Sequence, residues 1–255
     1  MSLTVVTSFS PAGHAQYGGK FLRSFKGRWP QEVALKVYHE GPCPKDVGSG
    51  EGVDLLSTEP CASFLDRHRD NPVVHGRKPA PGHAWKDSAI KARQNFRYDA
   101  YKFARKVFAV AHAARGCGGK LFWLDADIQT HAVVPAAFLH EMLPDEAGIC
   151  HIARPGYHSE CGFIGYNLAH AETRRFLTDF EHVYAADLFL QYREWHDSYI
   201  FDRLLERSGV NTRQIPWTQK MTPVEHSPLG KYLIHFKGTR KDSQDMMDRH
   251  WRVLG

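Results

Sequence analysis

Two carboxylates lie one residue apart in the middle of the chain, where Asp125 and Asp127 flank Ala126 directly after the apolar run 120–124. Such a pair can share one divalent cation. Mg²⁺ and Mn²⁺ prefer hard oxygen ligands and keep coordination positions open for phosphate oxygens, so the pair suits a site for a nucleoside diphosphate. The alternative interpretation is an acid pair that caps a loop or lies in solvent, which is the commoner role of an isolated Asp-x-Asp.

The elements around this pair predict where it lies. Residues 3–9 form a β-branched run that ends at Ser10-Pro11, and residues 120–124 form a second apolar run, so both are expected to be buried strands. The acid pair would then lie at the carboxyl end of a strand, which is where open α/β sheets bind their ligands. The location and the chemistry of the pair agree.

Strands and helices alternate along the rest of the chain. Hydrophobic periodicity predicts further strands at 33–38, 147–153, 162–167 and 232–236, and helices around 21–25, at 86–114, 171–186 and 194–208. We expect an α/β fold, a three-layer α/β/α sandwich with a Rossmann-like, mixed and mostly parallel sheet. One domain is expected over 1–255, with an irregular insertion at about 41–85 that holds one short helix at 61–69 and no regular sheet.

The composition indicates a globular protein with a mildly basic surface. The chain is 42% hydrophobic and 24% charged with a formal net charge of +5, which suits an anionic ligand such as a nucleotide or a polyanion such as DNA. It has no run of 18 apolar residues and no signal-like start, so we expect no membrane span and a cytoplasmic location. Its five cysteines form no C-x-x-C pair, which predicts free thiols.

Two motifs resemble those of a known group of enzymes. Trp123-Leu-Asp-Ala-Asp127 resembles the Asp-x-Asp motif of the GT-A-fold glycosyltransferases, in which the acid pair binds a metal and a sugar nucleotide. Leu233-Ile-His-Phe-Lys-Gly238, followed by Arg240-Lys241, resembles the His-Phe-x-Gly-x-x-Lys block of glycosyltransferase family 8, which includes glycogenin and bacterial lipopolysaccharide galactosyltransferases. The resemblance implies a GT-A-type fold and a metal-dependent sugar transfer.

The resemblance also implies roles for individual residues. The metal ligands would be Asp125, Asp127 and His235, and an imidazole suits Mn²⁺. Cationic side chains neutralise the charge that develops on a departing diphosphate. The implied contacts to the donor are made by Asp125, Gly238 and Lys241, with Lys237 and Arg240 as further candidates, and by Thr7, Ser8 and Phe9 toward the base and ribose.

A basic segment precedes the acid pair. Residues 91–106 carry six basic residues against one acid, Asp99. In the GT-A enzymes a basic residue on this helix often reaches the nucleotide, so the resemblance makes Arg97 and Lys102 candidates for donor binding. The alternative is a solvated helix face with no role in binding.

Two further stretches resemble the acceptor-side blocks of family 8 and depart from them in part. Glu160 and Cys161 replace the Asn and Ser of an Asn-Ser-Gly block that here reads on to Asn167. Asp197 matches the start of an Asp-Gln-Asp block whose other two residues are replaced by Ser198 and Tyr199. The candidate catalytic residues are Asp197 and Glu160, and Asp197 would stabilise a cation-like sugar or orient the acceptor.

The motifs together predict a glycosyltransferase that uses Mn²⁺ or Mg²⁺ and a nucleoside-diphosphate sugar, with a UDP-sugar favoured. The acceptor is open among a glycan, a protein and DNA, and family 8 implies retention of anomeric configuration. Two alternatives remain: a phage-type sugar transferase that modifies hydroxymethylpyrimidine DNA, or a metal-dependent nucleotidyltransferase. A catalytically silent binding module is a further possibility.

One other motif fails on inspection. The stretch Gly13 to Lys20 follows a predicted strand and nearly spells a phosphate-binding loop. However, Lys20 comes one residue late, and Phe21 occupies the place of the metal-binding Ser or Thr. A phosphate-loop nucleotidase is therefore not predicted.

Overall fold

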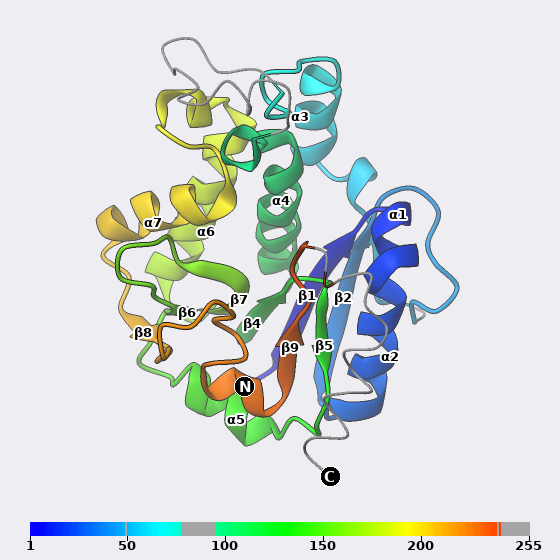
Figure 1. Cartoon of the computed structure of the whole chain (residues 1–255), viewed down its shortest axis with the longest axis vertical. Coiled ribbons are helices and arrows are strands. Elements are labelled where there is room, and N and C mark those ends of the chain that lie inside the picture. The colour runs from blue at the N-terminus through cyan, green and yellow to red at the C-terminus, as the bar shows by residue number, and fades with distance from the viewer. Residues whose placement is uncertain (49, 78–94, 239, 241–255) are drawn as a thin grey trace.

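The computed structural model describes residues 1–48, 50–77, 95–238 and 240. Its main sheet has seven strands in the order β3-β2-β1-β4-β7-β6-β8 (Figure 1). These strands are β1 (Leu3–Phe9), β2 (Val33–His39), β3 (Gly52–Asp54), β4 (Lys120–Leu124), β6 (Ile149–Ile152), β7 (Glu160–Asn167) and β8 (Thr212–Gln214). Only β7 runs against its neighbours; the other pairings are parallel. The mixed, mostly parallel sheet predicted from the sequence is confirmed.

Helices cover both faces of this sheet. They are α1 (Pro11–Gly13), α2 (Gly19–Arg28), α3 (Cys61–His68), α4 (Ala100–Gly116), α5 (Ala136–Met142), α6 (Ala171–Ala185) and α7 (Asp197–Ser208). Phe108 of α4 and Phe201 of α7 belong to one core cluster, and Phe25 of α2 and Phe138 of α5 belong to another. Two cores separated by one sheet make the predicted three-layer sandwich.

The sequence of the central strand β1 shows why helices pack on both faces of the sheet. Val5 and Val6 are both completely buried, but they belong to the two different core clusters. Successive side chains of a strand point to opposite faces, so a β-branched run without polar alternation needs packing on both sides. The continuous apolar sequence of this strand therefore specifies a central position in the sheet.

A second, smaller sheet lies beside the first. Strands β5 (Ile128–Thr130) and β9 (Leu233–His235) pair antiparallel, with Ile128 opposite His235. Figure 1 shows this ribbon beside the carboxyl-terminal half of β4. The pairing brings a segment near the end of the chain to the loop that follows β4.

The chain after β1 is helical from the first residues. Ser10 caps α1 by accepting a hydrogen bond from Gly13, and a π-helical turn, His14–Gly18, leads directly into α2. A Cβ at Gly18 would lie 2.9 Å from a ring carbon of Phe9, so the glycine allows the helix to pack against the strand end. This geometry is not a phosphate-binding loop, in agreement with the sequence.

The expectation of no regular sheet within 41–85 is wrong. Strand β3 pairs parallel with β2 and forms the edge of the main sheet. Gly52 leaves room for the loop between the two strands, because a Cβ there would lie 2.8 Å from the Cys43 sulfur. A three-residue strand has no periodicity of its own, so only the pairing with β2 reveals it. The short helix expected at 61–69 is present as α3, and residues 78–85 lie outside the described part.

Two helices begin later than predicted. The helix expected at 86–114 is α4, which starts at Ala100 because the Asp99 carboxylate accepts a hydrogen bond from Lys102 N at 3.1 Å and caps it. Residues 86–94 lie outside the described part, and Phe96–Tyr98 form a 3₁₀ turn. Helix α7 starts at Asp197, because His196 takes the N-cap position. The helix α5 and the strands β5 and β8 were not predicted from the sequence.

Two simpler expectations concern the cysteines and the membrane. All five cysteines are free thiols, as predicted, and three of them are buried. Within the described ranges, no helix combines the length and the apolar character needed to cross a membrane.

Candidate functional site

Asp125 and Asp127 lie on the turn that follows β4. The turn is held in place by the backbone, since Asp125 N donates to Gly162 O of β7 and Ile128 N donates to Asp125 O, both at 2.9 Å. The Asp125 side chain is partly exposed and that of Asp127 is buried, with 27% and 10% of their surfaces accessible. The pair therefore has one face toward solvent and one toward the protein.

The β5–β9 ribbon brings His235 to this pair. Phe236 N donates to Asp127 O at 2.9 Å, which fixes the end of β9 against the acid turn. The His235 Nε2 atom lies 3.0 Å from Asp127 Oδ1 and 3.7 Å from Asp125 Oδ2. The three ligand atoms lie within 4.8 Å of one another, so the predicted set of metal ligands is brought together.

The donor set fits a divalent cation. Two carboxylate oxygens and one imidazole nitrogen are ligands that Mn²⁺ accepts, and Mg²⁺ accepts the oxygens. The Nδ1 atom of His235 is buried and has no hydrogen-bond partner among the described residues, while Glu160 Oε1 lies 3.7 Å away. A proton on Nδ1 would face this carboxylate and would leave the Nε2 lone pair directed at the acid pair, as a metal-binding histidine requires.

Lys106 is the functional residue that the sequence analysis missed. Its ammonium lies 2.8 Å from Asp125 Oδ1 and 2.6 Å from Asp197 Oδ2, and it donates to Cys161 O at 2.8 Å. Burial alone would lower the pKa of Lys106, but the two carboxylates raise it well above its ordinary value. The available signal was its helical spacing from Ala109 and Val110, three and four residues further on, which are buried in α4 and share a face with it.

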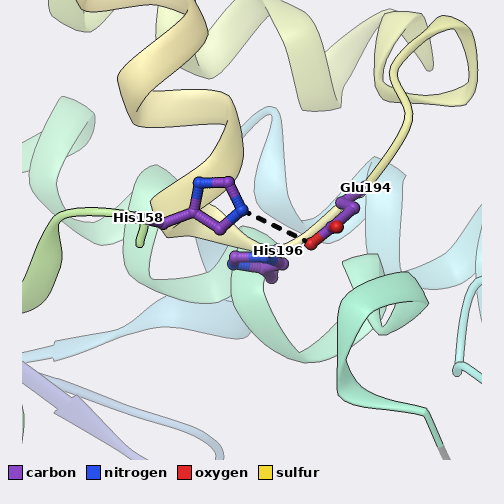
Figure 2. Close-up of side chains that lie close together, drawn as sticks. All are labelled: His158, Glu194 and His196. Carbon is purple, nitrogen blue, oxygen red and sulfur yellow. Dashed lines mark hydrogen bonds and ion pairs between the residues drawn. The ribbon is translucent and has the colours of Figure 1, made fainter. Parts of the chain in front are cut away.

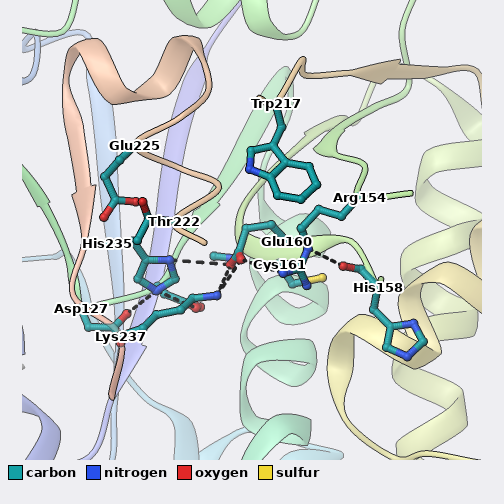
Figure 3. Close-up of polar contacts among 12 residues, drawn as sticks. Asp127, Arg154, His158, Glu160, Cys161, Trp217, Thr222, Glu225, His235 and Lys237 are labelled. Atoms are coloured by element: carbon teal, nitrogen blue, oxygen red, sulfur yellow. Dashed lines mark hydrogen bonds and ion pairs between the residues drawn. The ribbon is translucent and has the colours of Figure 1, made fainter. Parts of the chain in front are cut away.

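Glu160 forms a second charged group behind His235. Figure 3 shows the Glu160 carboxylate between the His235 ring and the Lys237 ammonium, whose nitrogen lies 2.7 and 2.6 Å from the two carboxylate oxygens. Burial would raise the pKa of Glu160, but Lys237 and His235 lower it to about 2. Lys237 is therefore paired with Glu160 at the start of β7, and its expected contact with a diphosphate stays a prediction.

Gly162 makes room for this arrangement. A Cβ at this position would lie 2.5 Å from His235 Cε1, 2.8 Å from His235 Nδ1 and 3.0 Å from Glu160 Oε1. Contacts this short do not occur between real side chains, so only glycine lets the imidazole lie against β7.

A cavity of about 440 Å³ opens in front of the acid pair. It extends from Asp125 and Asp127 past Lys102 to the end of β1, where Ser8 and Phe9 line it together with Tyr17. Thr7 is completely buried and does not line it. Of the residues proposed for the base and ribose, the structure therefore brings Ser8 and Phe9 to the cavity and leaves Thr7 in the core.

Several predicted residues lie elsewhere. Arg97 precedes α4, does not line the cavity and lies 3.6 Å from Glu194. Asn167 is at the end of β7 that pairs with the start of β4, away from the acid pair. Its amide donates to Asp145 O at 3.1 Å. Gly238 is exposed in a left-handed conformation after β9. Arg240 is bonded to the carbonyl of His235, and Lys241 is outside the described residues.

No protein-family model and no curated protein matches the sequence. Solved structures do match. A glycosyltransferase involved in the glycosylation of the major capsid of PBCV-1 aligns with a TM-score of 0.53 and 10% identity over 98% of this chain and 100% of that one. An active-site mutant of LgtC aligns with a TM-score of 0.50 and 11% identity over 99% and 95%. The apo form of mouse xyloside xylosyltransferase 1 aligns with a TM-score of 0.46 and 15% identity over 85% and 87%.

At these identities, the first two matches establish the fold. The chain has the α/β architecture of GT-A glycosyltransferases, with nearly the full length of both chains aligned. The predicted fold class is confirmed. A shared fold hosts many chemistries, so the fold alone does not assign an activity to this chain.

Proposed function

We propose that the protein is a metal-dependent glycosyltransferase that moves a sugar from a nucleoside diphosphate to an acceptor. The observation that carries this proposal is the meeting of Asp125, Asp127 and His235 at the mouth of a cavity, with their ligand atoms within 4.8 Å of one another. The location at the carboxyl end of β4 supports it, because open α/β sheets bind their ligands there. We propose a UDP-sugar as the donor.

The three ligands would hold Mn²⁺ or Mg²⁺ against the diphosphate. A bound divalent cation supplies positive charge that stabilises the departing diphosphate. The remaining cavity accommodates the nucleoside, with Phe9 and Tyr17 as aromatic surfaces for the base and Ser8 as a hydroxyl partner for the ribose. Lys102, which lines the same cavity, adds a cation on the donor side.

Lys106 and Asp197 would face the sugar. The Asp197 carboxylate is 4% exposed and lies 2.6 Å from the Lys106 ammonium, so it is engaged by a cation. We therefore propose that Asp197 stabilises positive charge on the sugar ring or orients the acceptor instead of removing a proton from it. This supports retention with attack on the same face as the leaving group, as expected from the sequence resemblance.

Glu160 has a supporting role in this proposal. Both of its oxygens are bound by Lys237, so neither is available to a substrate. Its contact with His235 favours the imidazole orientation that coordinates a metal. Glu160 is thus proposed as a positioning residue, in place of the catalytic role first considered.

The decisive test is nucleotide binding with and without Mn²⁺. We expect calorimetric titration with UDP, GDP, ADP and CMP to show tight binding of one nucleoside diphosphate, and UDP in particular, only when Mn²⁺ is present. Asp127→Asn and His235→Ala should each weaken that binding at least tenfold. Metal-independent binding, or full binding by both variants, would contradict the proposal.

The released product separates the alternatives. A sugar transferase or a slow donor hydrolase releases UDP from a UDP-sugar, whereas a nucleotidyltransferase forms or consumes pyrophosphate. Turnover that requires duplex DNA containing hydroxymethylpyrimidine would identify the acceptor as nucleic acid. The remaining acceptor classes, a glycan or a protein, are distinguished by which of them increases UDP release above the hydrolysis background.

A further inference from the structure

A second group of metal-binding side chains lies at the start of α7, separate from the acid pair. Figure 2 shows the imidazoles of His158 and His196 close together beside the Glu194 carboxylate. Glu194 Oε2 lies 3.0 Å from His196 Nε2 and 3.6 Å from His158 Nε2. One ligand atom from each residue lies within 4.8 Å of the other two. The proposed function gives this group no role.

The hydrogen bonding of His158 indicates a cation between the side chains. Its Nδ1 lies 3.3 Å from Asp202 Oδ2, and a proton on Nδ1 satisfies that carboxylate. Asp202 is itself held by Ser159 N at 3.1 Å. The Nε2 lone pair of His158 then faces a Glu194 oxygen, which also accepts. Only a second proton or a metal ion can lie favourably between these two acceptors.

A third side chain completes the ligand set. His196 converges on the same Glu194 oxygen as His158, so a metal ion between them could be reached by both imidazoles and the carboxylate. His196 Nδ1 accepts a hydrogen bond from Tyr199 N at 3.4 Å, near the upper limit for such a bond. Moving the ring proton to Nδ1, to expose Nε2, gives up this weak contact, and a metal ion at Nε2 would replace the 3.0 Å hydrogen bond from Nε2 to Glu194.

The surroundings suit a bound cation. Aromatic rings enclose the cluster, with Phe96 and Phe103 centred 5.6 and 6.0 Å from the His196 ring and Tyr199 5.1 Å from the His158 ring. Arg97 occupies the other Glu194 oxygen at 3.6 Å. The two carboxylates, Glu194 and Asp202, therefore carry more charge than the single arginine.

We propose that His158, Glu194 and His196 bind a Zn²⁺ ion. Two imidazoles and one carboxylate form a three-ligand set that zinc accepts in tetrahedral geometry, with a water molecule in the fourth position. The side chains of Glu194 and His196 are buried, and His158 is 34% exposed, which leaves access for the ion and the water from the His158 side. The Asp202–His158 contact supplies the carboxylate that commonly orients a zinc-bound histidine.

The zinc ion would connect three segments next to the candidate acceptor side. His158 is two residues before Glu160 in β7, Glu194 is in the loop before α7, and His196 directly precedes Asp197. Lys106 then joins Asp197 to Asp125. The ion therefore acts as a structural link that fixes the N-terminus of α7 relative to β7.

Cobalt absorption in the full-length protein tests the site without any nucleotide. Co²⁺ in a tetrahedral site gives strong visible bands, and Zn²⁺ displaces it. We use an Asp127→Asn background, which disables the acid-pair site, and expect one equivalent of Co²⁺ with these bands, titrated away by Zn²⁺. Adding His158→Gln, which changes a partly exposed side chain, should weaken Co²⁺ and Zn²⁺ binding at least 100-fold.

Two controls decide the outcome. His182→Gln, at an exposed histidine of α6, should leave Co²⁺ binding unchanged. Glu194→Gln keeps the shape of the third ligand and should weaken binding as His158→Gln does, with circular dichroism showing that both variants are folded. Absence of the bands in the Asp127→Asn protein, or bands that persist in the folded His158→Gln protein, would overturn the proposal. Neither result depends on the sugar-transfer reaction.

Discussion

The imidazole of His235 is held from several directions at once. Its backbone is in β9, its carbonyl is bonded to Arg240, and its ring lies against Gly162 and near Glu160. A ligand fixed in this way needs little reorganisation when a metal binds. The affinity for metal should therefore be sensitive to small steric changes behind the ring.

Gly162→Ala tests this sensitivity. The new methyl group would lie 2.5 Å from His235 Cε1, so we expect the ring to move and Mn²⁺-dependent nucleotide affinity to fall at least tenfold. Gly165→Ala, on the same strand, is the matched control, because its Cβ would meet Cys150 and Phe122 instead. It should reduce stability while leaving that affinity intact. Equal losses of affinity in the two variants would contradict the steric argument.

Lys106 and Asp197 should be energetically coupled. Lys106→Met leaves the buried Asp197 carboxylate without its cation, so we expect a loss of about 3 kcal/mol in the free energy of unfolding, measured by urea titration. In the double variant with Asp197→Asn the loss should be at least about 1 kcal/mol smaller than the sum of the two single losses. Simple additivity would show that the 2.6 Å pair contributes nothing beyond its separate members.

At the scale of elements, α3 is anchored to the segment after α6 by one carboxylate. Asp187 lies in a left-handed conformation and accepts from Arg67 at 3.0 and 3.1 Å and from His68 at 2.7 Å. Burial would raise the pKa of Asp187, but these hydrogen bonds lower it below the ordinary value of 3.8. The anchor ties part of the predicted insertion to the helical layer.

Asp187→Asn tests the anchor, since asparagine tolerates the left-handed backbone. A depressed pKa contributes stability that is present above the ordinary value and lost as the pH falls through the folded value. We therefore expect the variant to be about 1 kcal/mol less stable than the parent at pH 7. The difference should shrink in urea titrations as the pH is lowered below 3.8. A difference that stays constant with pH would mean that the charge of Asp187 is not responsible.

The elements also show what a sequence can predict. Long periodic segments such as β1, α6 and α7 were located from their hydrophobic pattern, with errors only at the caps. The strands β3, β5 and β8 have three residues each, and their existence depends on partners far away in the chain. Local pattern carries no information about such partners.

The same distinction applies to the site. Asp125, Asp127 and His235 lie in local motifs and were predicted. Lys106 and the Glu160–Lys237 pair were assigned other roles or none, because their function arises from contacts 55 to 91 residues apart in sequence. A charged residue on a buried helix face is a useful local indication of such a contact. Lys106 is a residue of this kind.

At the scale of the whole molecule, the candidate site joins parts that otherwise touch little. Its ligands come from the turn after β4 and from β9, and Lys106 adds α4. A ligand that binds only the folded state stabilises it by about 2.7 kcal/mol at 100 times its Kd. For a chain of this size we expect UDP with Mn²⁺ to raise the melting temperature by about 5 to 10 °C.

Thermal denaturation monitored by fluorescence measures this shift. UDP alone and Mn²⁺ alone should give much smaller shifts than the two together, because each completes only half of the site. The Asp127→Asn variant should show no added effect of the pair. A full shift with UDP in the presence of a chelator would exclude a metal-mediated diphosphate site.

The pairing of β5 with β9 also determines when the protein can first bind its ligands during synthesis. Asp127 and His235 are separated by 108 residues, which takes a ribosome about 5 to 20 s to translate. During that interval the acid pair has emerged without its imidazole, and Glu160 lacks Lys237. Any part of the central sheet that forms during this interval therefore forms without stabilisation by metal and nucleotide.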